Sequence, residues 1–309
     1  MSNVSVKKRR LSKSELTKRK EKTISFIILL VACVIWSIPI IYMIGTSFKS
    51  DYDLMVHPEK FFPSAGEWTF KHYSGLFINN GDIDNLPKWL FNSIWSTAVN
   101  VLLTVLVDLI TAYALVFLKF KGKKPIIAFL MLWMTLPGVV GLAPNYSIYT
   151  GLRNSLNLQP NTTLLYFYIY SWLILPGVSG IFNMLLMRTF FLSIPMEIVE
   201  SAKSDGASNM LVFRKIICPL AKSTVLIIIL FSFTGSWNSL VFPQLLLAGD
   251  SIAWKTITLG LTAYTGGSGW DATGLAMASS VVSLIPVVIV FAVTQNKMID
   301  GMASTGVKG

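Results

Sequence analysis

The chain has few charged residues and few of the side chains that catalyse reactions or bind metals. Of its 309 residues, 13% are charged and 53% are hydrophobic, and there are two cysteines and two histidines. His57 and His72 have no neighbouring cysteine or suitably spaced carboxylate, so a metal site is not expected. Cys33 lies in an apolar segment and Cys218 in a polar one, so we expect no disulfide between them. The composition argues against a metalloprotein and against a disulfide-stabilised domain.

A phosphate-binding loop is also missing from the sequence. No segment has the pattern Gly-x-x-x-x-Gly-Lys-Ser/Thr, in which backbone amides hold nucleotide phosphates. We find no other catalytic motif, so we expect a non-catalytic chain that carries no cofactor. Any step driven by ATP would need a separate subunit that hydrolyses the nucleotide.

Long apolar segments, by contrast, are abundant, and the mean hydropathy is +0.61. Six segments are each about long enough to cross a hydrocarbon core of about 30 Å. They comprise residues 24–48, 89–118, 125–142, 164–187, 224–247 and 275–295. The first is too long for a secretory signal and has no clear cleavage site after it, so we expect it to be retained. The sequence predicts an all-α polytopic membrane protein with six transmembrane helices.

Lysine and arginine indicate the orientation, because they concentrate on the cytoplasmic side of membrane proteins. With the N-terminus inside, twenty of the 26 lie on the cytoplasmic side and six lie outside. We divide the chain into a basic cytoplasmic tail (1–23), a six-helix transmembrane domain (24–298) with a cytoplasmic loop (193–220), and a cytoplasmic C-terminal tail (299–309). The net charge of +11 therefore reflects topology, and nucleic acid is not expected as a partner.

Two polar regions outside the predicted spans allow more than one interpretation. The basic tail between Lys7 and Lys22 is able to contact anionic membrane lipid, or it forms a solvated arm. The outer segment 49–88 carries six acids and both histidines, and we predict that it packs as a small cap against a partner.

The loop 193–220 has the pattern of two short helices. Pro195 marks the first start, Gly206 its stop, Ser208 the second N-cap and Pro219 the second stop. Apolar residues recur at helical spacing in both parts, namely Ile194, Ile198, Val199 and Ala202, then Met210, Phe213 and Ile217. The spacing alone leaves open whether this loop docks to a partner or is a solvated amphipathic hairpin.

The residues of this loop resemble the EAA loop of ATP-binding-cassette importer permeases. The matching positions are Glu200, Ala202, Asp205, Gly206, Ala207, Ile216 and Pro219. Ser201 replaces the middle alanine of that motif and Cys218 replaces the leucine before proline. Further similar positions are Ala112-Tyr113-Ala114, Trp237-Asn238, Pro243 and the terminal Gly306 to Gly309. Together they make nearly the whole chain similar to the maltose-type carbohydrate permeases.

The resemblance implies a function and a set of partners. The chain would be a permease subunit in a bacterial cell membrane, assembled with a homologous second permease, two ATPase subunits and an extracellular solute-binding protein that delivers an oligosaccharide. The residues implied in ATPase coupling are Glu200, Ser201, Ala202, Asp205, Gly206, Phe213 and Pro219. Among these, Glu200 would make a polar contact, Ala202 would allow close approach and Gly206 would permit the sharp turn.

The translocation path is less clearly marked. Five predicted spans contain an internal proline able to kink the helix, namely Pro39, Pro137, Pro176, Pro243 and Pro286. Trp237 and Asn238 offer an aromatic face and an amide suited to a sugar, or alternatively core packing and an interhelical hydrogen bond. The outer segment Thr265, Gly266, Gly267, Ser268 and Gly269 would contact the binding protein, or it is a turn at the lipid boundary.

Asp108 is an acid placed deep in the second predicted span. An intramembrane carboxylate is costly unless it is paired or neutral. One interpretation makes Asp108 the cation or proton site of a secondary transporter, and the other pairs it with a polar group. A third class of function is a membrane scaffold whose loop around Glu200 recruits a cytoplasmic protein.

Overall fold

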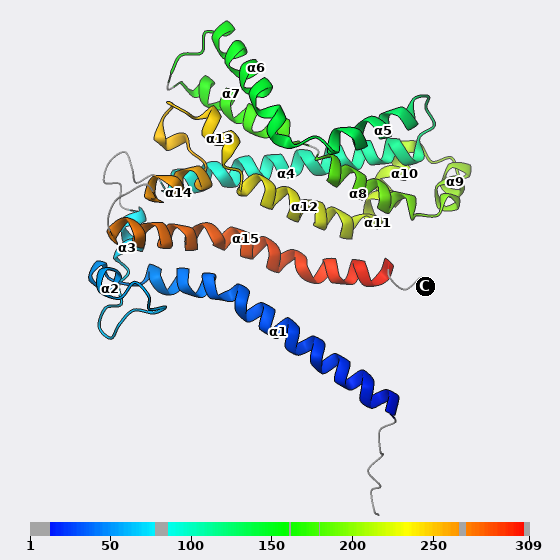
Figure 1. Ribbon diagram of the computed structural model, residues 1–309. Coiled ribbons are helices and arrows are strands. Elements are labelled where there is room, and N and C mark those ends of the chain that lie inside the picture. The colour runs from blue at the N-terminus through cyan, green and yellow to red at the C-terminus, as the bar shows by residue number, and fades with distance from the viewer. Residues whose placement is uncertain (1–12, 78–85, 161, 179, 266–269, 306–309) are drawn as a thin grey trace, which may run out of the picture.

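The computed structural model describes residues 13–77, 86–160, 162–178, 180–265 and 270–305 (Figure 1). Regular structure in these residues is helical, apart from one isolated β-bridge between Lys49 and Trp68. The predicted all-α fold class is confirmed for the described part of the chain.

Four stretches of the described chain are helical, long and apolar enough to cross a membrane. They lie in α1 (Lys13–Ser47), α4 (Leu86–Phe117), α12 (Lys222–Trp237) continuing to α13 (Val241–Leu246), and α15 (Trp270–Thr305). Large apolar side chains on their outer surfaces are exposed, as at Leu29, which is 64% exposed. Such surfaces suit lipid tails, so these helices agree with a multi-pass membrane protein.

Two further apolar segments are bent. The helices involved are α5 (Lys123–Met134), η1 (Gly138–Gly141) and α6 (Leu142–Ser155), and then α7 (Thr163–Ile174), η2 (Leu175–Gly177) and α8 (Ile181–Leu192). The first pair bends by 97° and the second by 45°. The third and fourth predicted segments are therefore not single straight helices. If each bent pair is one span, the total is six, and that number stays a prediction.

Three of the five prolines lie at or beside a break in a helix, and the other two lie within continuous helices. Pro137 precedes η1 and Pro176 lies in η2, so both stand where a helix is interrupted. Pro243 lies in α13, just after α12 has ended. Pro39 and Pro286, in contrast, lie within α1 and α15, which continue as helices through them. Each remains helical because a proline removes one backbone hydrogen bond without necessarily ending the helix.

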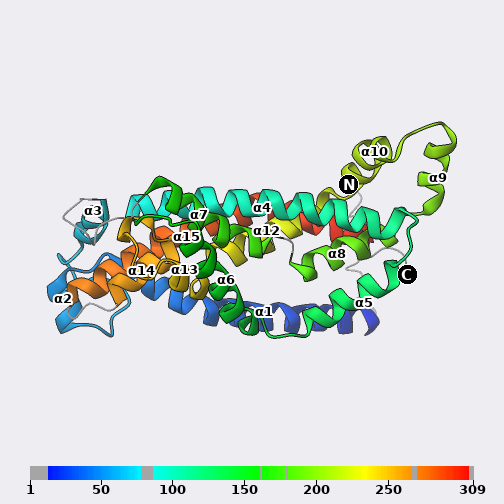
Figure 2. The same cartoon turned by 90° about the horizontal axis from the view of Figure 1, so that it is seen from above.

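The two ends of the molecule carry different short helices. Figure 2 shows α9 (Met196–Ser204) and α10 (Asn209–Val212) at one end and α2 (Asp51–Val56) and α3 (Lys71–Phe77) at the opposite end, as in Figure 1. Such separation along the long helices is what a cytoplasmic loop 193–220 and an outer segment 49–88 require.

The outer segment is held by buried polar groups. The Nζ atom of Lys49 donates to the carbonyl oxygen of His57 at 2.9 Å, and Lys49 is fully buried. Burial lowers the pKa of Lys49, although the charge of Asp53 opposes this. Burial alone would raise the pKa of Asp53, but hydrogen bonds from Ser64 hold it below its ordinary value. His72 is also buried, with Nε2 at 3.0 Å from the carbonyl oxygen of Lys49. These contacts hold residues 49–72 together, and α2 and α3 pack against α15.

Helices α4 and α14 (Ile257–Thr265) pack closely in the half of the bundle that carries α3. Trp89 on α4 is fully buried and its Nε1 donates to the carbonyl oxygen of Ile252 at 2.8 Å. A Cβ atom at Gly260 would lie 2.1 Å from the indole ring of Trp89. Only glycine therefore allows α14 to approach this ring so closely.

Gly260→Ala should destabilise the folded protein by about 1–3 kcal/mol, because the added methyl group overpacks the contact with Trp89. The apparent Tm of the detergent-solubilised protein measures the effect. Gly151→Ala is the matched control, since Gly151 is also helical and has open space around its Cβ position. Equal Tm values for the two variants would contradict the packing role of Gly260.

Candidate functional site

The loop 193–220 folds as two helices joined by a tight turn. Pro195 directly precedes α9, and Gly206, after its end, has a φ of +86°, a conformation that suits glycine. The Oγ atom of Ser208 accepts a hydrogen bond from the backbone N–H of Leu211 at 3.3 Å and so caps α10. The predicted helix boundaries at these three residues are confirmed.

The predicted stop at Pro219 is wrong. After α10 the chain forms a π-helix, η3 (Phe213–Ile217), and then α11 (Cys218–Leu220), which contains Pro219 in its first turn. Only Ala221 separates α11 from α12. Proline fits there because it lacks the N–H that a helical bond would use, and the wider π-turn precedes it. The second half of the loop thus runs almost directly into the fifth apolar segment.

One side of α10 faces the bundle and the opposite side is exposed. Val212 is fully buried, whereas Met210 is 63% exposed. Two positions along a helix correspond to about 200°, so these residues lie on opposite sides of it. In α9, Val199 is buried and Ile198 is exposed. The loop therefore packs on the bundle through Val199, Val212 and Ile217.

The remaining surface of the loop combines acids with exposed apolar side chains. Glu200, Ser201 and Asp205 are exposed, and Ala202 is partly buried. Within the described chain, Glu200 makes no ion pair. The exposed large apolar residues are Met196, Ile198, Met210, Leu211 and Leu220. A mixture of exposed apolar groups and unpaired carboxylates suits a surface that another protein covers.

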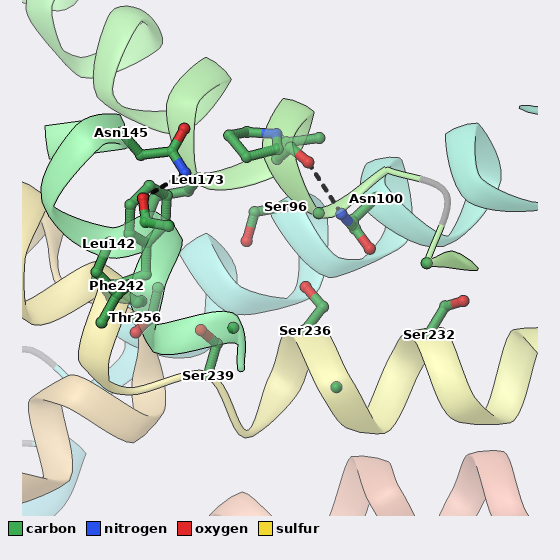
Figure 3. Close-up of a pocket in the computed structure, with 18 of the residues that line it drawn as sticks. Ser96, Asn100, Leu142, Asn145, Leu173, Ser232, Ser236, Ser239, Phe242 and Thr256 are labelled. Atoms are coloured by element: carbon green, nitrogen blue, oxygen red, sulfur yellow. Dashed lines mark hydrogen bonds between the residues drawn. The ribbon is translucent and has the colours of Figure 1, made fainter. Parts of the chain in front are cut away.

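A cavity of about 390 Å³ lies deeper in the bundle, where the two bent pairs are interrupted (Figure 3). Its polar lining residues are Ser96, Asn100, Asn145, Asn183, Ser232, Ser236, Ser239 and Thr256. Figure 3 shows the side chains of α4 and of α12 facing each other across this space. Among the described residues that line it, no side chain carries a formal charge.

Backbone groups line the cavity where helices are interrupted. Gly141 precedes α6 and Gly180 precedes α8, and neither helix has a side-chain cap. The first N–H groups of α8 therefore lack intrahelical acceptors and are available to a bound molecule or water, whereas the N–H of Leu142 at the start of α6 donates to the carbonyl oxygen of Val139 in η1. Gly177 approaches Asn100 so closely that a Cβ atom there would lie 3.2 Å from Nδ2. The cavity thus offers donors from the backbone.

Asparagine side chains supply acceptors. The Nδ2 atom of Asn100 donates to the carbonyl oxygen of Ile174 at 3.1 Å, and that of Asn145 donates to the carbonyl oxygen of Gly141 at 2.8 Å. Because a backbone carbonyl only accepts, these bonds fix which end of each amide is the nitrogen. The Nδ2 atom of Asn183 lies 3.1 Å from Oγ of Ser232. With its hydroxyl groups, this lining can both donate and accept hydrogen bonds.

Trp237 and Asn238 do not line this cavity. Trp237 is 1% exposed, stacks on Phe233 and donates from Nε1 to the carbonyl oxygen of Ser283 at 3.2 Å. Its contacts correspond to the core-packing interpretation, because the ring has no free face for a sugar. Asn238 is exposed at the end of α12. The serines on either side of them, Ser236 and Ser239, line the cavity instead.

The cavity residues on α4 had a signal in the sequence that the prediction missed. Polar residues recur at every fourth position of this apolar segment, namely Asn92, Ser96, Asn100, Thr104 and Asp108, and all are buried. Such spacing places them on one face of a helix. Asp108 therefore ends a polar row and is not isolated, and it has an interaction partner within the protein. This placement favours the structural interpretation of Asp108.

Two predicted segments cannot be assessed as sites. Thr265 ends α14, and Gly266, Gly267, Ser268 and Gly269 lie outside the described residues. The terminal segment 306–309 lies outside them too. The predicted contact of residues 265–269 with a binding protein stays a prediction.

Similarity to known proteins decides the family. The model for the "Binding-protein-dependent transport system inner membrane component" matches residues 104–299, which is more than half of the chain and contains the loop 193–220. The chain belongs to this family. The suspected resemblance to transport permeases is thereby confirmed, and with it the assignment to a membrane transport system.

Relatives of this inner membrane component span nearly its whole length. It is 30% identical over 273 residues to the diacetylchitobiose uptake system permease protein DasC of Streptomyces coelicolor, covering 88% of the chain and 91% of the relative. It is 25% identical over 271 residues to the arabinooligosaccharides transport system permease protein AraQ of Halalkalibacterium halodurans, covering 88% and 91%. A crystal structure of a bacterial ABC transporter involved in importing the acidic polysaccharide alginate contains a chain of the same fold. The TM-score is 0.73 at 21% identity, covering 94% of this chain and 99% of that one.

Proposed function

We propose that this inner membrane component is the permease subunit of an ATP-driven importer for neutral oligosaccharides. The observation that carries the proposal is the uncharged polar cavity at the helix breaks, between α4 and α12. Sugar hydroxyls both donate and accept hydrogen bonds, which matches a lining of amides, hydroxyls and the N-terminus of α8. Relatives named for diacetylchitobiose and for arabinooligosaccharides agree with this substrate class.

The absence of charge along the described cavity lining favours a neutral over an acidic sugar. A helix N-terminus stabilises an anion by about 0.3–1 kcal/mol, up to about 2 in favourable sites. Removing a carboxylate from water costs several kcal/mol, so the N-terminus of α8 would not offset it without a basic side chain. The acidic substrate of the alginate importer therefore does not transfer to this chain with the fold.

The partners follow from the same proposal. A homologous second permease completes the path, and two ATPase subunits bind the loops of the permeases on the cytoplasmic side. An extracellular solute-binding protein delivers the sugar at the end that carries α2 and α3. Both termini are cytoplasmic in this arrangement, in agreement with the positions of the basic residues.

In this proposal the chain is non-catalytic and the loop 193–220 transmits the work of the ATPases. Glu200 makes a polar contact with the ATPase, while Ile198 and Met210 supply exposed apolar contacts. Movement of the docked loop tilts α8 and α12, to which it is joined, and alters access to the cavity. A secondary transporter driven through Asp108 is disfavoured, because the carboxylate has a partner inside the protein. A scaffold would leave the polar cavity without a role.

Co-purification from the native membrane, followed by uptake assays in proteoliposomes, tests this proposal. The expected complex contains a second permease and an ATPase, and it takes up diacetylchitobiose or an arabino-oligosaccharide on addition of binding protein and ATP. An oligouronate of similar length should fail to compete at the transport step. A chain that purifies without an ATPase, or a complex that transports the oligouronate preferentially, would contradict the proposal.

A further inference from the structure

The loop 193–220 is joined to only two of the helices that line the cavity. Its first half follows α8, and its second half continues through η3 and α11 into α12. The third wall, α4, carries Ser96 and Asn100 but has no direct chain connection to the loop. Any motion of the loop must reach α4 through contacts between side chains and backbone.

Tyr113 makes that contact at the inner end of α4. Its hydroxyl donates a hydrogen bond to the carbonyl oxygen of Asn209, the first residue of α10, at 3.0 Å. Among the described residues, this is the only side-chain hydrogen bond between the loop and a long helix that does not adjoin it. The side chain is 6% exposed, so water competes little for the bond.

The ring of Tyr113 extends the connection. It contacts Phe213 of η3 edge-on, with ring centroids 5.0 Å apart, and lies 5.3 Å from the ring of Phe117. Phe117 in turn contacts Phe191 near the end of α8. One side chain therefore links α4 to the second half of the loop at two points, through its hydroxyl and through its ring.

The part of α4 between Tyr113 and the cavity is suited to transmit a displacement of the loop. Asn100 lies thirteen residues earlier on α4, which corresponds to about 20 Å along the axis. No proline or break interrupts α4 between the two residues, unlike the bent pairs α5–α6 and α7–α8. A displacement at Tyr113 is thus passed to the cavity wall along a continuous helix.

We propose that Tyr113 is a positioning residue that couples the ATPase-driven movement of the loop to α4, and so to the cavity side chains Ser96 and Asn100. The inference rests on the proposed function, since it requires an ATPase bound to the loop. It assigns to Tyr113 a role in transmission, whereas Glu200 and the exposed apolar groups serve in docking.

Tyr113→Phe tests the role, because it removes the hydroxyl and keeps the ring. In the reconstituted complex, the ATPase should co-purify in the wild-type amount, while the sugar transported per ATP hydrolysed falls about three- to tenfold, the effect of one neutral hydrogen bond. Tyr42→Phe is the matched control, since the Tyr42 hydroxyl also donates to a backbone carbonyl, that of Pro58, at 2.9 Å near the outer end of α1. It should leave the ratio unchanged.

Several outcomes separate this inference from the proposed function. A wild-type chain that binds no ATPase would overturn both. An unchanged transport ratio in an intact Tyr113→Phe complex, or loss of ATPase binding in that complex, would overturn the role of Tyr113 in transmission alone. If Tyr113→Phe fails to accumulate, Phe213→Leu replaces it, because it removes the ring contact and keeps the hydroxyl. A lower ratio with normal assembly is again the expected result.

Discussion

Glu200→Arg combined with Gly206→Pro should abolish ATP-dependent uptake while the protein remains in the membrane. Proline has a φ near −65° and cannot adopt the +86° of Gly206, so the turn between α9 and α10 must change. Reversing the charge of an interfacial carboxylate costs about 2–5 kcal/mol. A loss of 2 kcal/mol corresponds to binding about 30-fold weaker. The ATPase should therefore be lost on co-purification.

Gly66→Pro is the matched control for this loop variant. Gly66 also has a positive φ, of +84°, and open space around its Cβ position, but it lies in the outer segment at the opposite end of the molecule. This variant should retain the ATPase, as measured by quantitative co-purification. Retention of the ATPase by the loop variant as well, with uptake intact, would show that the docking surface lies elsewhere.

Gly235→Trp should block transport by filling the cavity while leaving assembly intact. Gly235 lines the cavity from α12, and a Cβ atom there would meet no heavy atom within 4 Å. An indole added at this position therefore extends into space of about 390 Å³ without a backbone clash at its base. We expect sugar uptake to fall to background and the ATPase to co-purify normally.

Gly151→Trp separates obstruction of the cavity from a general effect of a large side chain. Gly151 lies on α6, is exposed and has open space around its Cβ position, but it does not line the cavity. Uptake by this variant should match the wild type. If Gly235→Trp transports sugar at the wild-type rate, the cavity is not the translocation path.

The sequence predicted the loop correctly at the positions where one residue determines the local backbone geometry. Gly206 and Ser208 mark a turn and a cap whose geometry is set by their own backbone and side chain. The stop predicted at Pro219 was wrong because the π-turn before it accommodates the proline within a helix. Helical structure continues through Pro219 to Leu220, and only Ala221 separates it from α12. Apolar spacing also did not indicate that Val212 is buried while Met210 is exposed. The helical nature and the membrane location of the chain were predictable from its long apolar segments alone.

The cavity could not be predicted in the same way, because it forms where separate helices meet. Hydropathy indicates that 125–142 and 164–187 are apolar, but not that they bend by 97° and 45°. Trp237, an aromatic residue beside an amide, was one candidate for contact with a sugar, but tertiary packing buries its ring. The recurrence of polar residues every four positions from Asn92 to Asp108 was the one sequence signal for this polar helix face. Only the structure shows that this polar face of α4 lines the same cavity as Ser232 and Ser236 on α12.

Energy coupling is the most direct test of the central claim. The purified complex, reconstituted in proteoliposomes with binding protein and a labelled neutral oligosaccharide, is assayed with ionophores that collapse proton and sodium gradients. We predict accumulation that requires ATP on the side of the loop 193–220, persists with the ionophores and disappears in Glu200→Arg with Gly206→Pro. Accumulation without ATP that the ionophores abolish would contradict the claim and would identify gradient-driven transport instead.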